Sequence, residues 1–219
     1  MDLEAIHSYI PRFVDAFFLT IRIGWIGIAL AFVIGILAAF IMYFKIPILK
    51  SVVRAYVELF RNTPLLVQLF FVYFGLPKLG IPVSAESCGA IGLGLLGGSY
   101  MAESIRSGLE AVPVSQIEGA VALKMNKWQI FTSVILPQAF TLSITALVSN
   151  VIFLLKETSV FSAISLMDLM FTAKDLIGLY YRTTECLTLL VIFYIIMILP
   201  VSILGNVIEK KARFGMFGD

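Results

Sequence analysis

Charged residues are scarce in this chain. Asp, Glu, Lys and Arg make up 14% of its 219 residues, whereas hydrophobic residues make up 60%. A soluble globular domain has about 25% charged and about 45–50% apolar residues. With a mean hydropathy of +0.99, the chain has too little charge to cover a surface that faces water on all sides. This composition excludes an ordinary soluble enzyme, a disordered chain and a disulfide-rich scaffold.

The residues that carry out most enzyme chemistry are also few. The chain has one histidine, His7, near its N-terminus, and two cysteines, Cys88 and Cys186, which do not form a CxxC motif. A Ser-His-Asp triad, a Cys-His pair or a His-rich metal site therefore cannot form in the body of the chain. We expect no catalytic residue, no metal ligand and no cofactor on this chain. The net charge of +2 also gives no indication of nucleic-acid binding.

Nucleotide-binding motifs are absent or out of context. No GxxxxGKS or GxxxxGKT occurs, so the chain cannot bind ATP through a P-loop. Residues 92–97 match GxGxxG, but they lie inside a charge-free run, where neither the preceding strand nor the solvated helix end of a dinucleotide site is expected. We interpret Gly94 and Gly98 instead as a GxxxG pair that lets two membrane helices approach closely.

Five apolar segments are long enough, or nearly long enough, to cross a membrane. About 20 apolar residues in a helix cross the ~30 Å hydrocarbon core. The predicted spans are 23–44, 62–77, 87–106, 128–155 and 186–208, of which the second and third have polar edges. Such helices are common where protein rather than lipid surrounds them. We therefore expect an all-α polytopic membrane protein with five transmembrane helices.

These spans form one predicted membrane domain, residues 23–209. Residues 1–22 contain acidic residues in place of a basic n-region, so we expect an extracytoplasmic or interfacial lead-in rather than a cleaved signal peptide. A loop over about 107–127 and a tail over 210–219 are expected outside the membrane.

Lysine and arginine are unevenly distributed around the predicted spans. Ten of the sixteen lie in the loop after the first span, at the end of the third span or in the loop that follows it, and in the tail. Because cytoplasmic loops carry the excess of basic residues, we expect the N-terminus outside and the C-terminus in the cytoplasm. In this topology Cys88 and Cys186 lie near the outer ends of their spans. A disulfide between them is geometrically possible, but we expect both to be packing residues.

The loop over 107–127 carries the signals of a short helix. Ser115 and Glu118 match a capping box, in which each side chain accepts a hydrogen bond from the other residue's amide. Pro113 blocks the preceding helix, so we expect the short helix to begin at Ser115 and to end near Asn126. Its apolar side carries Ile117, Ala120 and Val121. This helix either docks on a partner in the cytoplasm or lies on the membrane surface.

The residues of this loop resemble the EAA loop of ABC importer permeases. That motif reads Glu-Ala-Ala, three residues and Gly, followed about nine residues later by Ile-x-Leu-Pro. Glu118 and Ala120 match its beginning, and Pro137 ends the matching Leu-Pro. Gly119 stands in place of the first Ala, and Lys124 stands in place of the Gly. If that position needs a positive φ, Lys124 tolerates it at a cost of about 1–2 kcal/mol.

Three further segments resemble signature stretches of polar amino-acid permeases. Residues 61–68 are similar to the family's Arg-Gly-Thr-Pro-Leu-Leu-Val-Gln. Residues 99–108 are similar to Ala-Tyr-x-Ala-Glu-x-x-Arg-Gly-Gly, and residues 156–160 to Lys-Asp-Thr-Ser-Leu. The segments occur in the family's order across most of the chain. The sequence therefore resembles the transmembrane permease subunit of a polar amino-acid ABC importer of the histidine and glutamine kind, with the type I importer fold.

The resemblance implies a division of labour among several chains in the bacterial cytoplasmic membrane. This permease and a second one, identical or homologous, line a pathway within the lipid. Two partner ATPases bind ATP and Mg, and an extracytoplasmic amino-acid-binding protein delivers the solute. The loop helix inserts into a groove on the ATPase and transmits its closure as a rigid body. The ATPase-coupling residues are Ser115, Glu118, Gly119, Ala120 and Lys124. Candidates for contacting the binding protein are Asp168, Lys174, Asp175 and Arg182.

Polar residues inside or at the ends of the spans indicate where the solute passes, because they are costly in lipid and usually face a cavity. The pathway candidates are Gln68, Ser149, Asn150, Lys156, Glu157 and Thr158. They offer donors for a carboxylate and acceptors for an ammonium, although interhelical hydrogen bonds explain each of them equally well. At the cytoplasmic helix ends, we expect Glu103 to pair with Arg61 or with Arg106. Thr63 is a candidate cap of the second span.

We therefore predict a non-catalytic permease subunit of an ABC importer that moves polar amino acids. The alternative is a stand-alone secondary transporter or channel for a small polar solute. No inverted repeat is detectable in the sequence, and no isolated intramembrane acid suggests a proton carrier. Strict dependence of transport on an ATPase distinguishes the two functions.

Overall fold

The computed structural model describes residues 2–217, and every regular element in that range is a helix. The long helices are α1 (Leu3–Tyr43), α5 (Ala85–Glu110), α8 (Leu136–Glu157) and α10 (Thr183–Phe217). The shorter ones are α2 (Leu49–Arg61), α3 (Leu65–Phe70), α4 (Leu76–Lys78), α6 (Val114–Ala122), α7 (Lys127–Ile130) and α9 (Leu169–Tyr180). Two π-helices, Phe71–Gly75 and Phe131–Ile135, and a 3-10 helix, Thr158–Ile164, connect some of them. The predicted all-α class is confirmed.

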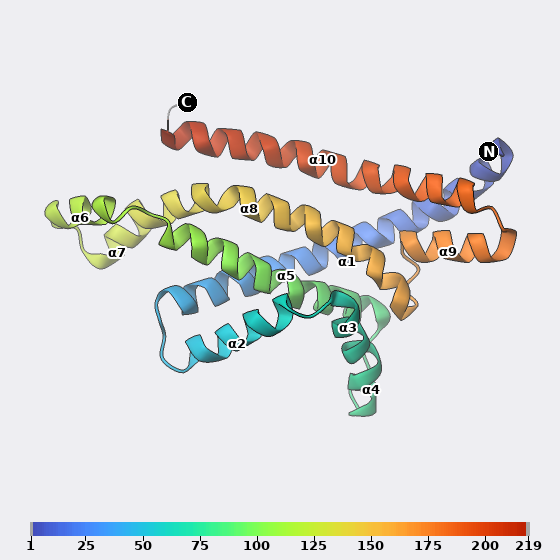
Figure 1. Cartoon of the computed structure of the whole chain (residues 1–219), viewed down its shortest axis with the longest axis horizontal. Coiled ribbons are helices and arrows are strands. Elements are labelled where there is room, and N and C mark those ends of the chain that lie inside the picture. The colour runs from blue at the N-terminus through green and yellow to red at the C-terminus, as the bar shows by residue number, and fades with distance from the viewer. Residues whose placement is uncertain (1, 218–219) are drawn as a thin grey trace.

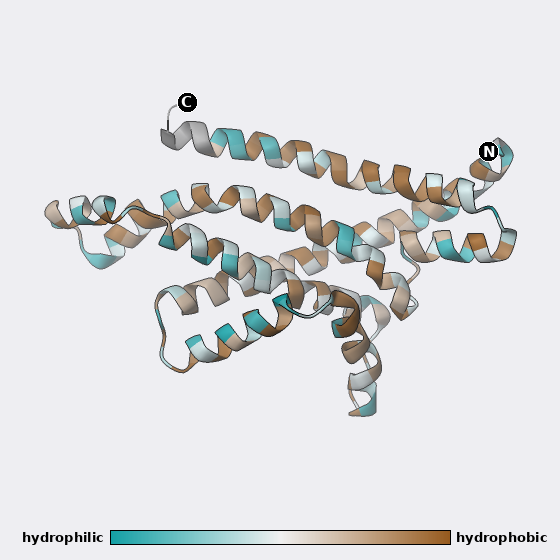
Figure 2. Ribbon diagram, viewed as in Figure 1, coloured by the Kyte–Doolittle hydropathy of each residue, from teal (hydrophilic) through white to brown (hydrophobic). Residues whose placement is uncertain are grey.

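The long helices run lengthwise as an elongated bundle, and α2 lies along one side of it (Figure 1). Helices α6 and α7 form one end of the molecule, called the α6 end below. Helix α9 and the N-terminus lie at the opposite end, called the N-terminal end. The pair α3 and α4 projects sideways from the bundle. Figure 2 shows hydrophobic residues along most of α10 and hydrophilic residues along α2 and at the bundle ends.

Three helical stretches are long and apolar enough to cross a membrane: Glu4–Tyr43, Lys127–Ile164 and Thr183–Ala212. A fourth candidate is a bent pair, Leu49–Arg61 with Leu65–Lys78, whose arms meet at 108°. Helix α5 does not belong to this set, although it lies at the centre of the bundle and most of its middle residues are buried. Protein rather than lipid surrounds α5, which explains its weak apolar signal. Five membrane spans remain a prediction.

Helix α5 packs closely against α1 because glycines line their contact. A Cβ atom at Gly94 would lie 2.8 Å from the Cβ of Leu30, and one at Gly98 would lie 2.7 Å from Cγ2 of Ile34. Both neighbours belong to α1. A larger side chain at either glycine would push the helices apart. The predicted role of this GxxxG pair in helix packing is therefore confirmed.

Helix α1 continues unbroken across the boundary expected after residue 22. Asp2 caps its start, where the carboxylate accepts hydrogen bonds from the amides of Glu4 and Ala5 at 3.1 and 3.3 Å. The first turns pack against α9 and α10 in a cluster that buries Phe13 completely. These contacts extend the helix well beyond the length that a membrane span needs. Cys186 belongs to the same cluster, and both cysteines are buried free thiols.

Both π-helices precede a proline near the start of the next helix. Pro77 follows Phe71–Gly75, and Pro137 follows Phe131–Ile135. Proline has no N–H to donate, and its ring collides with the carbonyl four residues earlier. A π-helix widens the turn and accommodates both effects. The kink expected at Pro137 takes this form.

Candidate functional site

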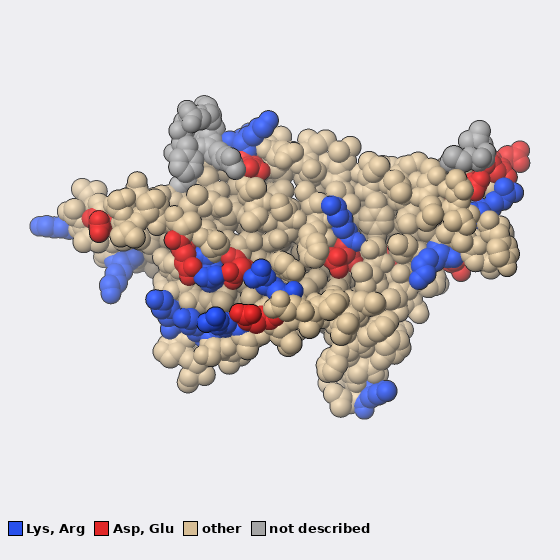
Figure 3. Space-filling model, in the orientation of Figure 1, with Lys and Arg blue, Asp and Glu red and all other residues tan. Residues whose placement is uncertain are grey.

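A charged cleft of about 610 Å³ lies between α2, α5 and the end of α1. Figure 3 shows basic and acidic side chains gathered in two facing rows over α2 and α5. The charged residues that line the cleft are Lys45, Lys50, Arg54, Glu58, Arg61, Glu103, Arg106 and Glu110. The cleft gathers charged side chains from two helices beside a recess that polar side chains of α5 and α8 line. The cleft is therefore the first candidate for a functional site.

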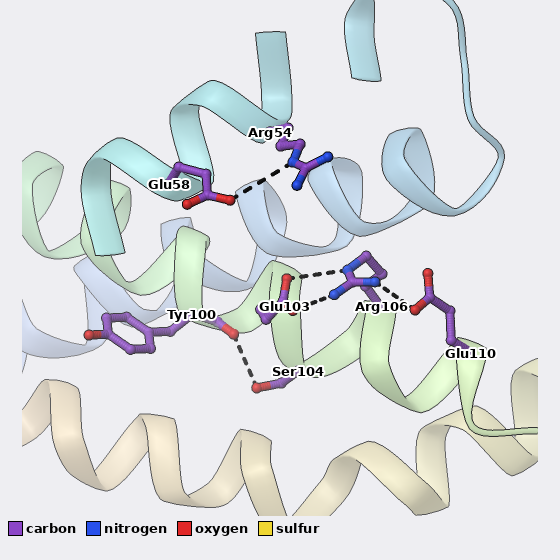
Figure 4. A network of polar contacts seen from close by, with 7 residues as sticks. All are labelled: Arg54, Glu58, Tyr100, Glu103, Ser104, Arg106 and Glu110. Atoms are coloured by element: carbon purple, nitrogen blue, oxygen red, sulfur yellow. Dashed lines mark hydrogen bonds and ion pairs between the residues drawn. The ribbon is translucent and has the colours of Figure 1, made fainter. Parts of the chain in front are cut away.

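Ion pairs along α5 form one wall of this cleft (Figure 4). The Arg106 guanidinium binds Glu103 one turn before it and Glu110 one turn after it, the latter at 2.6 Å. The sequence left two partners open for Glu103, and in the structure its partner is Arg106. This spacing places all three charges on one face of a helix, so α5 by itself fixes their arrangement.

An aromatic contact connects the wall of the cleft to α8. The guanidinium carbon of Arg61, the last residue of α2, lies 5.4 Å from the ring centroid of Tyr100. The Tyr100 ring packs against Phe153 of α8, with 5.2 Å between ring centroids. The three side chains therefore connect α2, α5 and α8. A cation over an aromatic face is attracted to its negative quadrupole, which helps to hold Arg61 in place.

A second recess of about 400 Å³ continues from the cleft toward α8. Arg61, Tyr100 and Glu103 line both spaces. On the α8 side, Nδ2 of Asn150 donates a hydrogen bond to Oγ of Ser104 at 2.9 Å. This bond leaves the Asn150 side-chain carbonyl free to accept another one. The structure thus brings one of the pathway candidates, Asn150, next to the residues of the charged cleft.

Gln68 has a different position. Its Nε2 donates to the carbonyl oxygens of Phe60 and Thr63 and contacts Oγ1 of Thr63, each at 3.0 Å, so it closes the corner between α2 and α3. The expectation that Thr63 caps the second span is wrong. Helix α3 begins after Pro64 without a side-chain cap. The sharp bend directs the Thr63 hydroxyl back to the carbonyl of Leu59, at 2.9 Å.

The other pathway candidates lie on α8 and at the start of the 3-10 helix. Thr158 is fully buried, and its hydroxyl donates to a backbone carbonyl of the preceding turn at 2.7 Å. Ser149 and Lys156 are exposed, and Glu157 is half-buried. Glu157 follows Asn150 by two helical turns, so both lie on the same face of α8. Within the described part of the chain, neither Lys156 nor Glu157 forms an ion pair.

The loop helix α6 begins one residue earlier than the sequence indicated. Its N-cap is Pro113, its first residue is Val114, and no side chain caps it. The expected capping box of Ser115 and Glu118 is therefore wrong. Ser115 already lies in the first turn, whereas the side chain of an N-cap must precede that turn to reach its free amides.

Lys124, not Asn126, ends this helix. Lys124 has a φ of +58°, its amide donates to the carbonyl of Val121 at 2.8 Å, and the next amide donates to the carbonyl of Ala120 at 3.2 Å. These two bonds form a Schellman motif, in which glycine is the usual residue with positive φ. Asn126 instead starts α7, in a capping box with Gln129.

Helix α6 has an inner and an outer face. Ala120 is 4% exposed and packs in a cluster with residues of α5, α7 and the following π-helix. Val114, Glu118 and Val121 recur at helical spacing and are all exposed. The sequence grouped Val121 with Ala120 on one apolar side, but Val121 is exposed whereas Ala120 is buried. Gly119 is also open, because a Cβ there would contact nothing within 4 Å. Two valines and a carboxylate are therefore exposed on the outer face of α6.

Asp168 caps α9 near the N-terminal end and is fully buried. Its carboxylate accepts hydrogen bonds from the amides of Phe171 and Met170 at 3.0 and 3.3 Å, and the next amide after Asp168 donates to Oγ1 of Thr20 at 3.1 Å. Burial raises the pKa of Asp168 to about 7, although the two amides and Lys174 favour the charged form. Asp168 was a candidate contact for a binding protein. That expectation is wrong, because the residue has no exposed surface.

The chain matches one family of transport proteins over nearly its whole length. Residues 9–214 match the family described as "binding-protein-dependent transport system inner membrane component". The chain belongs to this family. A putative glutamine transport system permease protein, GlnP of Rickettsia felis, is 34% identical over 90% of this chain and 91% of its own. The probable amino-acid permease protein YxeN of Bacillus subtilis is 32% identical over 96% of this chain and 95% of its own.

Solved structures show the same permease fold. The crystal structure of an amino acid ABC transporter with histidines has a TM-score of 0.90 and 31% identity, and the match covers 96% of this chain and 99% of that chain. An inward-facing MetNI methionine ABC transporter has a TM-score of 0.78 at 21% identity, over 93% of this chain and 97% of that chain, which supports the fold alone. The fold that the sequence motifs implied is confirmed.

Sequence reasoning missed several residues of this permease's cleft. Lys45 and Lys50 indicated topology only, and nothing indicated that Phe153 packs against Tyr100 of the cleft. Tyr100 and Ser104 lie one turn apart within residues 99–108, the stretch that resembles other permeases. Their spacing predicts a shared helix face, but it does not reveal that this face meets α8.

Proposed function

We propose that this permease imports a polar amino acid across the bacterial cytoplasmic membrane as a subunit of an ABC transporter. Membership of the family, relatives named as glutamine and amino-acid permeases, and similarity to an amino-acid ABC transporter support the proposal. ATP and Mg bind to partner ATPases, and this chain has no catalytic role.

The charged cleft with its recess is the observation that carries this proposal. An amino acid brings a carboxylate and an ammonium, and each must be matched when it leaves water. The guanidinium of Arg61 lies where the two spaces meet, and the free carbonyl of Asn150 lies in the recess. These groups supply a cation and an uncharged acceptor within one connected space.

Helix α6 is the proposed contact with the ATPase. Its exposed residues Val114, Glu118 and Val121 form the docking face. The opposite face packs through Ala120 onto the π-helix that precedes Pro137. A push on the outer face of this short helix therefore reaches the start of α8 through packed side chains. The turn at Lys124 holds the end of α6 in place.

The remaining partners follow from the proposed orientation. The α6 end faces the cytoplasm, and the N-terminal end faces an extracytoplasmic amino-acid-binding protein. A second permease chain completes the pathway. Single cysteines at positions 50, 124 and 174 test the orientation in intact cells with an impermeant maleimide. Lys174→Cys should be labelled, whereas Lys50→Cys and Lys124→Cys should be spared. The reverse pattern would overturn the orientation.

The function is tested by reconstitution in proteoliposomes. The permease is purified with its ATPase and supplied with the binding protein from the same gene cluster and a labelled amino acid. We expect uptake that requires ATP and stops when the P-loop lysine of the ATPase is replaced by alanine. Uptake by the permease alone would instead identify a secondary transporter or channel. Absence of uptake for every polar amino acid would reject the proposal.

A further inference from the structure

The acidic residues of the cleft are all engaged with arginines. Glu103 and Glu110 both bind Arg106, and Glu58 lies 3.8 Å from Arg54. Each pair belongs to a single helix, so it does not depend on how α2 and α5 move relative to each other. A carboxylate engaged with an arginine attracts an additional cation far less than a free one does.

Three other cations of the cleft have no such partner. Among the described residues, Lys45, Lys50 and Arg61 form no ion pair. Lys45 and Lys50 lie beside the start of α2, and Arg61 lies at its end, where the cleft meets the recess. Unpaired positive charge therefore lies at both ends of the α2 wall. With five basic and three acidic side chains, the cleft carries an excess of two positive charges.

The α8 side of the recess adds no negative charge. Its polar residues beyond the shared ones are Ser104, Ser107 and Asn150, which are all uncharged. Glu157 lies two helical turns further along the same face of α8, but it lines neither the cleft nor the recess. The recess therefore offers hydrogen-bond partners to an ammonium or an amide. It offers no free carboxylate to a second cationic group.

We propose that this cleft accepts amino acids with neutral or acidic side chains and rejects those with cationic side chains. The inference rests on the proposed function and names the substrate class of the same site. An amino acid with an uncharged side chain enters as a neutral zwitterion, and its carboxylate can pair with Arg61 through the planar guanidinium fork. An acidic side chain adds an attraction to the lysines. The side chain of arginine or lysine adds a repulsion.

The size of the discrimination follows from Coulomb's law. A unit charge about 10 Å from another near a protein surface changes a binding constant by roughly three- to fifteenfold, depending on screening by salt. With two excess charges, we expect glutamine and glutamate to bind at least about tenfold more tightly than arginine. The difference should shrink as the ionic strength increases, because the lysines are accessible to salt.

Direct binding to the permease–ATPase complex tests the proposal. The complex is placed in nanodiscs of uncharged lipid without the binding protein, so that only the selectivity of the membrane subunits is measured. Binding of radiolabelled glutamine, glutamate and arginine is then compared at pH 7.5. Arginine binding within about twofold of glutamine would overturn the proposal, as would a failure of all three to bind while uptake with the binding protein proceeds.

Charge variants sharpen the test. The double variant Lys45→Glu with Lys50→Glu reverses the sign of the excess charge and should increase arginine binding relative to glutamine at least about fivefold. Lys78→Glu is the matched control, because Lys78 lies on the projecting α4 and lines neither space. It should leave the ratio unchanged. An unchanged ratio in the double variant, with normal assembly by size-exclusion chromatography, would show that the lysines do not select.

A second variant tests Arg61 itself. Arg61→Gln should weaken binding of glutamine and glutamate about tenfold, and Arg61→Lys should recover part of that loss because it keeps the charge. If both variants bind like the original protein, Arg61 does not pair with the substrate carboxylate and the proposal falls. The proposed function has a separate readout, ATP-dependent uptake. Uptake of arginine alone would reject the substrate class and keep the function.

Discussion

Replacing Lys124 by glycine should stabilise the turn that ends α6. Lys124 has a φ of +58°, a conformation that costs a residue with a Cβ about 1–2 kcal/mol. Glycine avoids this cost, but it increases the entropy of the unfolded chain by about 0.4–1 kcal/mol. The exposed Lys124 side chain forms no ion pair with any described residue, so its loss costs little. The net gain should be about 0.5–1 kcal/mol.

Amide hydrogen exchange of the purified permease measures this gain locally. The amides of Lys124 and the following residue close the Schellman motif, and their protection should increase about two- to fivefold. Lys127→Gly is the matched control, because the same side chain is removed within the first turn of α7, where φ is ordinary. It should lower protection there. A loss of protection at residues 121–125 in Lys124→Gly would refute the assignment of the turn. Co-purification of the ATPase should stay equal or improve.

Other predictions follow from packing, docking and burial. Gly97→Ala should destabilise the permease by about 1–3 kcal/mol, because its Cβ would lie 2.7 Å from a Cβ of α1. Gly178→Ala lies in open space and should stabilise the permease by about 0.5–1 kcal/mol. Thermal unfolding in detergent measures both changes, and equal shifts would contradict the packing. Glu118→Ala should leave the melting temperature unchanged and weaken ATPase co-purification and uptake together. Ala120→Asp should lower the melting temperature, because it buries a charge. Full ATPase binding by Glu118→Ala would argue against the docking face. Because the pKa of Asp168 is raised to about 7 in the folded state, the folded protein keeps a proton that the unfolded chain releases from about pH 4 upward, so stability should fall as the pH rises from about 4 to 7. Asp168→Asn retains an acceptor for the cap and should flatten this dependence. A pH profile of stability that Asp168→Asn leaves unchanged would refute the prediction.

Much of the fold was readable because it depends on local composition. Charge-free runs located the helices that became α1, α8 and α10, since the lipid requirement acts on each segment separately. The same reasoning located the loop that became α6. Its start and end were misassigned because two capping signals compete in this loop. In the structure, Asn126 forms a capping box and Ser115 does not. The two local sequence patterns alone do not decide which residue caps a helix.

The candidate site depended on contacts that no local pattern encodes. The ion pairs of Arg106 follow from helical spacing and were among the sequence expectations. The bond between Asn150 and Ser104 and the stack of Tyr100 on Phe153 join residues of α5 and α8 that lie about fifty positions apart in the chain. Their partnership is set by the rotation of two helices about their axes.

The sequence by itself therefore determined that this protein is a bundle of membrane helices with a short loop helix, and which family it resembles. Only the tertiary structure decided which charges share a cleft and which of them remain unpaired. Helix formation and lipid burial are properties of a segment, whereas a cleft is a property of the space between segments. The 108° bend after Arg61 and the close contact of α5 with α1 define that space. They are fixed only when all the helices pack together.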